Sequence, residues 1–328
     1  MSFYRIVFSA VVFLCFSVLC ACASRKSDGN KATEKNQDKP EIEYIDGVLE
    51  NDLQEPAVFK PTEPEELKYF RLAYPDVKFL AYFDEEKKDW AILVVANGKT
   101  TLLYWCDCRF LPENEVQNKN SYRKMLYKYS SAVKNPENFT EQEISEIKTF
   151  TSKENRTSSA IDPPFLYDAI YESFSRQTIE RHIVKIGFLT KSMNVHERVS
   201  EKLAAISTKI MNLPKTPELE KFFATLDRTD AYVWRSVRDT QNRSFHSLGL
   251  AVDILPKGYY QKIIYWGWER QRKPDRWFMI PLEKRWMPPA EVRQIFAEAG
   301  FIWGGTWIVW DNMHFEYRPE ILLFSAEN

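Results

Sequence analysis

Two short polar segments constrain the fold of this chain more than any other feature of its sequence. Residues 244–253 read SFHSLGLAVD, and residues 311–314 read DNMH. Each segment contains one histidine and one aspartate. Two imidazoles and one carboxylate form a zinc ligand set that leaves a fourth position open, as catalytic sites do. A chain that uses both segments in one site must fold them side by side, although residues 254–310 separate them.

The backbone between these residues decides whether their side chains can converge. His246 and Asp253 are seven positions apart, so an uninterrupted strand would place them on opposite faces. Gly249 lies between them and allows a turn or bulge, after which a strand over residues 250–255 directs Asp253 inward. The spacing of the second segment predicts a turn that brings His314 to the start of a strand.

The joint pattern carries this prediction, because each residue alone is more often a core or surface group than a ligand. The chain has only four histidines, and we expect the other two, His182 and His196, to lie in helical, charge-rich surroundings. A serine hydrolase is disfavoured, since Ser244 lacks the G-x-S-x-G turn that exposes a nucleophilic serine.

Composition excludes some classes of function. The chain has 328 residues, of which 44% are apolar, so it is long enough for one large domain or two ordinary ones. Its 45 basic side chains are balanced by 46 acidic ones. This balance gives no global electrostatic case for nucleic acid as a partner, so the substrate must be recognised locally.

The N-terminus predicts export. In residues 1–22, Arg5 precedes an apolar run, and the sequence LCAC ending at Cys22 resembles a bacterial lipobox, whose cysteine is lipidated. We therefore predict a lipoprotein signal peptide, with an uncleaved N-terminal anchor as the alternative. Either places the body outside the cytoplasm, on the periplasmic or cell-surface face of a bacterial membrane. Residues 23–55 are too polar to form a core and are predicted to be a disordered tether.

Residues 56–155 are predicted to form a β-rich accessory region of unknown role. Its expected strands span residues 77–83, 90–96 and 100–105 and are joined by tight turns, of which Asn97-Gly98 is a strong hairpin signal. One helix embedded in loops is expected to follow. Cys106 and Cys108 would share one face of the last strand. We interpret them as structural, because a disulfide at that spacing is strained.

Residues 156–328 are predicted to form the chemistry-bearing domain, with helices packed on a small antiparallel or mixed sheet. Apolar periodicity predicts helices over residues 165–174, 179–188, 199–211 and 289–299. Strands are expected over residues 231–234, 250–255, 308–310 and 314–317. The fold class is therefore α+β, with a small meander preceding the main sheet.

Two extended motifs resemble a known family. They comprise Trp234-Arg235, Thr240, Arg243, Ser244-x-His246-x-x-Gly249-x-Ala251-x-Asp253, Gly300-Phe301-Ile302-Trp303-Gly304-Gly305-x-Trp307 and Asp311-x-x-His314-Phe315-Glu316. This pattern is similar to that of the zinc D-alanyl-D-alanine carboxypeptidases and L-alanyl-D-glutamate endopeptidases, which include the vancomycin-resistance dipeptidases and many phage endolysins. The resemblance covers about residues 160–322.

The resemblance implies one zinc ion per chain, held by His246, Asp253 and His314. It implies that Asp311 is the general base for the zinc-bound water, although some members carry glutamate there. It also implies an arginine that holds a substrate carboxylate or the developing oxyanion. Arg235 is the first choice for that role, and Arg238 and Arg243 are the alternatives.

The resulting prediction is an exported zinc peptidase that hydrolyses an amide bond in peptidoglycan stem peptides and is held at the membrane by lipid on Cys22. Trp303, Trp307 and Trp310 are expected mainly in the core, with one or two able to line a substrate groove. The bond cut is either D-Ala–D-Ala or L-Ala–D-Glu. The alternatives are a non-catalytic wall-binding lipoprotein of the same fold and a signalling or scaffold domain that binds zinc without turnover.

Overall fold

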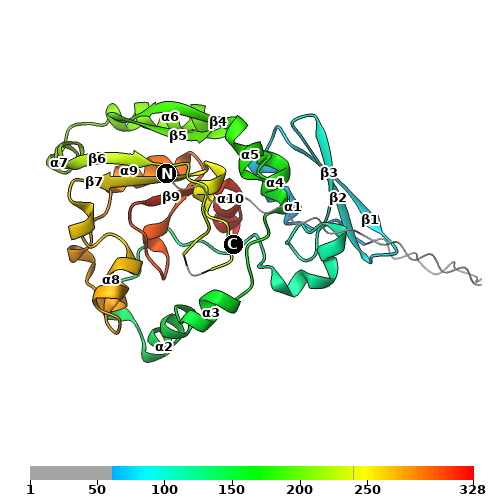
Figure 1. Cartoon of the computed structure of the whole chain (residues 1–328), viewed down its shortest axis with the longest axis horizontal. Coiled ribbons are helices and arrows are strands. Elements are labelled where there is room, and N and C mark those ends of the chain that lie inside the picture. Colours follow the sequence, from blue (N-terminus) through cyan, green and yellow to red (C-terminus); the bar gives the residue numbers. More distant parts are fainter. Residues whose placement is uncertain (1–60, 239) are drawn as a thin grey trace, which may run out of the picture. The chain divides into compact units, whose positions relative to one another are not determined.

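The computed structural model describes residues 61–238 and 240–328. The predicted signal peptide, with its lipidation site at Cys22, and the predicted tether over residues 23–55 lie outside the described residues. The described residues belong to one compact unit. Helices and small antiparallel sheets alternate along it, which confirms the predicted α+β class (Figure 1). No helix in this part of the chain is long and apolar enough to cross a bilayer.

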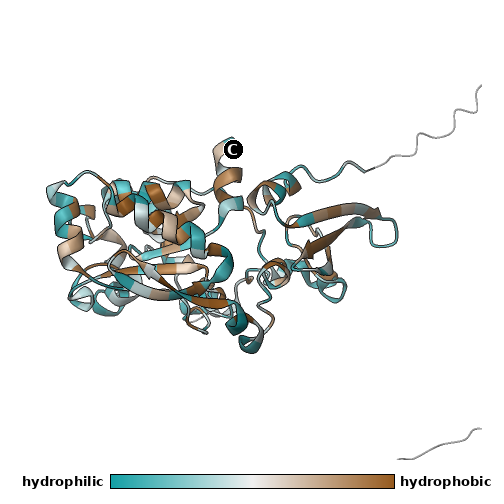
Figure 2. Ribbon diagram, turned by 90° about the horizontal axis from the view of Figure 1, so that it is seen from above, coloured by the Kyte–Doolittle hydropathy of each residue, from teal (hydrophilic) through white to brown (hydrophobic). Residues whose placement is uncertain are grey.

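The predicted meander is present and follows one short helix. Its elements are α1 (Leu67–Ala73), β1 (Lys78–Asp84), β2 (Asp89–Ala96) and β3 (Lys99–Tyr104). The three strands pair antiparallel in the order of the chain. Asn97 and Gly98 have φ values of 52° and 73°, which confirms the tight hairpin turn between β2 and β3. The strands are largely hydrophobic, and the turn between β1 and β2 is hydrophilic (Figure 2).

The two cysteines lie in a turn after β3, so their predicted place on a strand is wrong. Cys106, Asp107 and Cys108 have φ values of 46°, 58° and 66°, which strand residues do not adopt. The carboxylate of Asp89 accepts a hydrogen bond from the Cys106 amide at 3.0 Å and so supports the turn. Both thiols are free and buried. Burial raises the pKa of each to about 12, which leaves them chemically inert at neutral pH.

Residues 113–160 contain more helix than predicted. The elements are η1 (Glu113–Ser121), η2 (Pro136–Asn138), α2 (Glu141–Phe150) and α3 (Lys153–Ser158). Thr140 and Glu143 form a reciprocal capping box at the start of α2, and the Ser152 side chain caps α3. These caps satisfy amide groups that the helices leave unpaired and explain why two short helices replace the single predicted one.

Seven α-helices follow in the described part of the chain, and apolar periodicity predicted those over residues 165–171, 197–211 and 290–298. They are α4 (Phe165–Tyr171), α5 (Arg176–Ile179), α6 (Glu197–Met211), α7 (Pro217–Thr225), α8 (Trp266–Arg272), α9 (Ala290–Glu298) and α10 (Pro319–Glu327). Single 3₁₀ turns connect several elements: η3 (Glu180–His182), η4 (Phe245–Leu248), η5 (Tyr259–Gln261), η6 (Trp277–Met279), η7 (Leu282–Lys284) and η8 (Gly304–Thr306). Helix α6 buries four apolar residues at intervals of three or four, Val199, Leu203, Ile206 and Ile210, as the period of a helix requires.

Three predicted elements are wrong. The helix expected over residues 179–188 is mainly strand β4 (Ile183–Phe188), which forms a hairpin with β5 (Lys191–His196), because β-branched residues there favour a strand. The strand expected at 231–234 lies earlier, as β6 (Leu226–Asp230). Residues 308–310 are not a strand, since the Trp310 carbonyl bonds the first residue of α8 and its indole packs in a separate core.

The main sheet positions the predicted site. Its order is β6-β7-β9-β8, with β7 (Ala251–Pro256), β8 (Phe301–Trp303) and β9 (His314–Tyr317), and all pairs are antiparallel. Phe315 turns to the core face, where its ring stacks on Phe296 of α9 with centroids 4.0 Å apart. His314 and Glu316, its neighbours in β9, therefore lie on the opposite face.

A buried polar network joins the accessory region to β9. The hydroxyls of Tyr74, after α1, and Tyr167, in α4, each donate a 2.8 Å hydrogen bond to Glu320. Arg318 donates to the same carboxylate at 2.8 Å, and its guanidinium lies 3.8 Å from Glu316. The apolar side chains of α1, the meander and the main sheet also form one continuous core. The accessory region is thus linked, through Glu320 of α10 and Arg318, to Glu316 in the strand that carries His314.

Candidate metal centre

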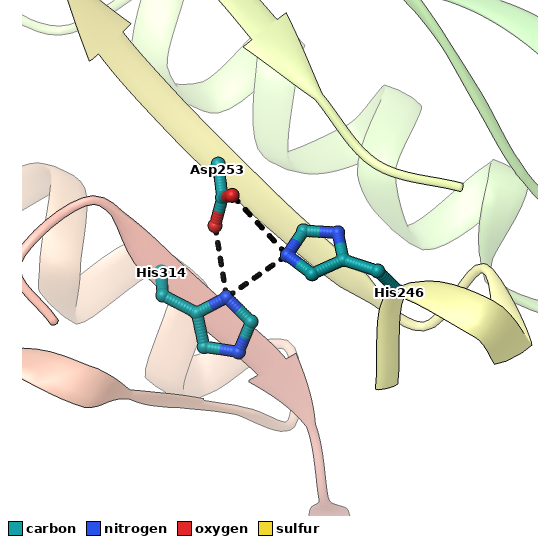
Figure 3. A group of neighbouring side chains, drawn as sticks. All are labelled: His246, Asp253 and His314. Carbon is teal, nitrogen blue, oxygen red and sulfur yellow. Dashed lines mark hydrogen bonds and ion pairs between the residues drawn. The ribbon is translucent and has the colours of Figure 1, made fainter. Parts of the chain in front are cut away.

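Three predicted ligands meet at the face of the main sheet opposite Phe315. Figure 3 shows His246, Asp253 and His314 pointing at a common centre. His246 Nε2 lies 3.1 Å from His314 Nδ1 and 3.2 Å from Asp253 Oδ2, and His314 Nδ1 lies 2.8 Å from Asp253 Oδ1. All three ligand atoms lie within 4.8 Å of one another. Of the residues that the structure describes, these three form the only such group.

The backbone at Gly249 delivers His246 to this centre. The Ser244 hydroxyl caps η4 by accepting a hydrogen bond from the His246 amide at 3.3 Å. Gly249 ends the turn with φ +66°, in the left-handed region that favours glycine. A Cβ at this position would lie 2.6 Å from the backbone nitrogen of His196. The turn expected at Gly249 is therefore present, and close packing against β5 also demands glycine.

Sheet register brings the other two ligands together. Asp253 in β7 and His314 in β9 are direct cross-strand partners, and their side chains share one face. A turn at Asn312 and Met313 precedes His314, as the spacing predicts. Both segments therefore meet at loop-to-strand junctions, and a shift of one residue in the β7–β9 register would move one ligand to the opposite face.

The outer nitrogens of both imidazoles are also held. His246 Nδ1 pairs with the Ala231 carbonyl at 2.5 Å, and His314 Nε2 pairs with Glu316 Oε1 at 3.0 Å. Each partner is an acceptor, so each outer nitrogen carries a proton, and the inner nitrogen is the one placed to bind a cation. The role of Glu316 was not predicted from the sequence. Its signal was its position, because residues two apart on a strand share a face.

The aspartate and the two histidines of this site stabilise each other's charged forms. Burial alone would raise the pKa of the Asp253 carboxyl, but His246 and His314 outweigh it and hold that pKa well below its usual value. Burial alone would lower the pKa of His314, but its hydrogen bonds to Asp253 and Glu316 raise it well above 6.5. A buried carboxylate that two imidazoles keep ionised is a suitable anionic ligand for a divalent cation.

The donor set fits zinc. Two imidazole nitrogens and one carboxylate oxygen, each supported from behind, match the three protein ligands of catalytic zinc sites. The nitrogens aimed at the centre are Nε2 of His246 and Nδ1 of His314, and Asp253 has an oxygen facing each of them. The fold therefore brings all three ligand groups to one centre.

Asp311 is a half-buried residue beside this group. Its backbone pairs with Tyr265 and donates to the Gly304 carbonyl at 2.9 Å. In the described part of the chain its Oδ1 is buried and has no hydrogen-bond partner. Burial, reinforced by the charge of Asp253, raises the pKa of Asp311 to about 7 despite the opposing charge of His314. A carboxylate of this kind is suited to accept a proton near neutral pH.

The three candidate arginines occupy different settings. Arg243 donates 2.6 Å hydrogen bonds to Asp168 and to the Ser173 carbonyl. Arg235 is exposed, and its charge is among those that lower the pKa of Asp311. Arg238 is also exposed and lines a neighbouring cavity. Arg235 is therefore close enough for its charge to affect the pKa of Asp311, whereas the Arg243 side chain is used in structural hydrogen bonds.

Two of the three tryptophans lie in hydrophobic cores, as expected for most of them. Trp303 and Trp310 are buried, at 4% and 2% exposure, and belong to hydrophobic cores. Trp307 is only half-buried, and its ring centroid lies 5.7 Å from that of His314. Trp307 is therefore the one of the three that stands beside a candidate ligand, where it can contact a bound substrate.

Comparison with known protein families supports a peptidase assignment for the segment that carries the metal centre. Neither a search of the curated proteins nor one of the solved structures gave a match. Residues 66–127, which contain α1 and the meander, match a family model described as a domain of unknown function (DUF8518). Residues 238–317, which contain His246, Asp253, Asp311 and His314, match the family model described as D-alanyl-D-alanine carboxypeptidase.

Proposed function

We propose that this protein is a zinc-dependent peptidase that hydrolyses an amide bond in peptidoglycan stem peptides. The observation that carries the proposal is the convergence of His246, Asp253 and His314, with supported outer nitrogens, inside the segment that matches a carboxypeptidase family. A zinc ion held by these residues supplies Lewis acidity, which polarises the scissile carbonyl and makes a water molecule more acidic.

The side chains around the ligands have separate roles in this proposal. Asp311 accepts the proton of the attacking water at its unpartnered Oδ1 and returns it to the leaving amine. Arg235 pairs with a substrate carboxylate or with the developing oxyanion, for which a planar guanidinium is well suited. Trp307 packs against the substrate beside His314 and excludes water from that side.

The proposed location follows from the N-terminal segment. Lipid on Cys22 anchors the chain to a bacterial membrane, and residues 23–55 tether the folded body within reach of the wall. This arrangement brings the enzyme to a polymer that does not diffuse. The partners are therefore peptidoglycan stem peptides and, through the lipid, the membrane.

Mass analysis of digested sacculi tests the proposal. The zinc-loaded protein is incubated with purified muropeptides, with and without a chelator, and the fragments are weighed. Release of one alanine identifies D-Ala–D-Ala carboxypeptidase activity, whereas a cut between L-Ala and D-Glu separates the stem from the glycan side. Zinc-dependent release of either kind supports the proposal.

A matched pair of variants separates catalysis from binding alone. Asp311→Ala should abolish fragment release while retaining zinc. The control variant is Asp275→Ala, which replaces an exposed aspartate in the turn after α8 and should leave fragment release unchanged. Full activity of Asp311→Ala would refute the assigned base. Bound zinc and bound stem peptide without any fragments would identify a non-catalytic wall-binding protein instead.

A further inference from the structure

A small cavity lies where the segment around η2 meets the turns η6 and η8. Its walls include Phe139, which follows η2, Phe278, in η6, and Gly305, in η8. Its volume is about 20 Å³, a space that holds a ligand about the size of one water molecule. The part of the lining that residues 133–139 supply lies in neither matched segment, so neither family match covers the whole cavity.

Arg285 places a buried positive charge at this cavity. Its side chain is only 8% exposed. Its Nε and Nη2 atoms donate to the Ile280 carbonyl at 3.0 and 2.7 Å, and its guanidinium carbon lies 4.5 Å from the centroid of the Trp310 ring. Burial lowers the pKa of Arg285 to about 10, and no neighbouring charge of the described residues offsets this effect. A carbonyl and an indole face orient the guanidinium but leave its charge without a counter-ion, which is costly inside a protein.

Two indole N–H groups at the cavity also lack an acceptor. Trp307 and Trp310 both line it, and within the described residues their Nε1 atoms are buried without a hydrogen-bond partner. Trp303 differs, because its Nε1 donates to the Asn312 carbonyl at 2.9 Å. Folded proteins rarely leave a buried donor unpaired. The two unpaired indoles therefore indicate that an acceptor binds in the cavity.

The polar side chains at the cavity are all hydrogen-bond donors. Among the described residues that line it, they are Lys134, Arg285, Trp307 and Trp310, and none of these side chains can accept a hydrogen bond. Lys134 is exposed and pairs with Glu143 at 3.5 Å. A water molecule would find donors for its lone pairs but no acceptor among these side chains for its own hydrogens. A monatomic anion accepts from each donor and also neutralises the guanidinium.

The cavity borders the candidate metal centre. Trp307 lines it, and the ring of the same residue lies 5.7 Å from that of His314. The backbone amides of Trp307 and Asp311 both donate to the Gly304 carbonyl, at 3.2 and 2.9 Å. A ligand that binds the Trp307 indole therefore restrains both a ring beside His314 and the turn that holds Asp311.

We propose that this cavity binds one monatomic halide anion, with chloride as the natural ion. Its donors are the guanidinium of Arg285 and the indole N–H groups of Trp307 and Trp310. The anion supplies their common acceptor and the missing negative charge, and it holds Trp307 in place beside His314. Binding of the anion does not depend on the proposed function, whereas its effect on hydrolysis does.

Bromide in crystals tests the position of the site. Crystals of the zinc-loaded protein are soaked in bromide, which scatters anomalously, and matched crystals are soaked in methanesulfonate, which is too large for the cavity. The expected result is a bromide peak within hydrogen-bond distance of Arg285 and both indoles. Absence of a peak in the cavity, including the case of a peak at the zinc ion alone, would overturn the proposal.

Thermal unfolding in solution tests whether the site is more than an adventitious ion only. The Tm of the zinc-loaded protein is followed as chloride replaces methanesulfonate at constant ionic strength, and its rise gives the chloride affinity. Arg285→Gln should weaken that affinity at least about tenfold, because the anion loses its charged donor. Arg293→Gln is the matched control. Its guanidinium carbon lies 4.6 Å from the centroid of the Trp303 ring but does not line the cavity, so the affinity should stay within about twofold.

A second cavity variant guards against misfolding caused by loss of Arg285. Trp307→Phe keeps an aromatic ring, removes one donor and should weaken chloride binding about threefold or more. A parent Tm that is the same in both salts, or an unchanged chloride affinity in both cavity variants, would overturn the proposal and leave the proposed function intact. A parent protein that binds chloride but releases no muropeptide fragments would instead overturn the proposed function and leave the anion site intact.

Discussion

The four histidines of this chain form two close pairs that differ in where their nitrogens point. The rings of His246 and His314 lie 4.9 Å apart, and those of His182 and His196 lie 5.6 Å apart and nearly parallel. Each pair has carboxylates nearby. Only in the pair of His246 and His314, however, does one nitrogen of each ring contact the same carboxylate, that of Asp253. Proximity of two imidazoles therefore does not by itself make a metal site.

The partners of His196 explain the difference. Its Nε2 pairs with the Tyr171 carbonyl at 3.1 Å, and its Nδ1 accepts a hydrogen bond from the Arg198 amide at 3.1 Å, where it caps α6. Both ring nitrogens are thus used by the backbone. His246 and His314 each direct one nitrogen to a supporting acceptor and keep the other for the shared centre. His196 therefore holds secondary structure together, whereas His246 and His314 are arranged to hold a cation.

The strongest test replaces one member of each pair. His246→Ala should lower zinc content below stoichiometry and reduce hydrolysis of muropeptides by at least about a thousandfold, because zinc loses a ligand and catalysis its Lewis acid. His182→Ala should leave both within about twofold. Zinc content is measured by atomic emission and turnover by fragment mass. A marked loss of zinc from the His182 variant would mean that both pairs bind metal.

The supporting carboxylates offer a smaller contrast. Glu316→Gln should weaken zinc binding about 10- to 100-fold, because the acceptor behind His314 Nε2 loses its charge. Glu197→Gln is the matched control, since Glu197 lies 2.8 Å from His182 Nδ1, and it should leave zinc affinity unchanged. Competition with a coloured chelator measures both. Equal affinities in the two variants would remove Glu316 from the proposed site.

Gly249 connects the two pairs through the backbone. Its carbonyl accepts a 3.0 Å hydrogen bond from the His196 amide, and a Cβ there would clash with that nitrogen. Gly249→Ala should lower the free energy of unfolding by about 2 kcal/mol through backbone strain and the clash. Gly98→Ala has a similar φ and no atom within 4 Å of its Cβ, so it should cost less. Urea unfolding compares them, and equal losses would show that packing at Gly249 is unimportant.

The smallest effect concerns protonation of His196. Burial lowers its pKa to about 4, against the opposing Tyr171 hydrogen bond, and the neighbouring charges are His182, Glu197 and Arg198. As the pH falls, His196 is protonated in the unfolded chain at about pH 6.5 but in the folded chain only near pH 4. The contribution of neutral, buried His196 to the free energy of unfolding is therefore complete above pH 6.5 and is lost as the pH falls toward 4.

Between pH 7 and pH 5.5 this loss should be about 1 kcal/mol. His196→Gln should remove that part of the pH dependence, which is measured as the difference between the urea unfolding curves of the two proteins at each pH. The same difference at pH 7 and at pH 5.5 would show that His196 does not titrate with folding in this range.

Much of this arrangement could be predicted locally. Alternation and an Asn-Gly turn predicted the meander, apolar periodicity predicted α6 and α9, and spacing around Gly249 predicted the turn before Asp253. The hairpin β4–β5 was missed because Ile183 to Phe188 has apolar residues at both helical and strand spacing. The strand predicted over residues 231–234 was wrong because the amides of Tyr232 and Val233 donate to the carbonyls of Asn194 in β5 and His246 in η4, outside the main sheet.

The sequence by itself determined the residue types, their spacing and the turns that expose them, because these depend on local backbone preferences. Only the tertiary structure decided the register that sets Asp253 opposite His314, the hydrogen-bond acceptor behind each imidazole's outer nitrogen, the burial of the Asp311 Oδ1 atom and the meeting of α3 with α8. Each of these joins segments that are distant in the chain. Such contacts form through packing of the whole core, and no local pattern specifies them.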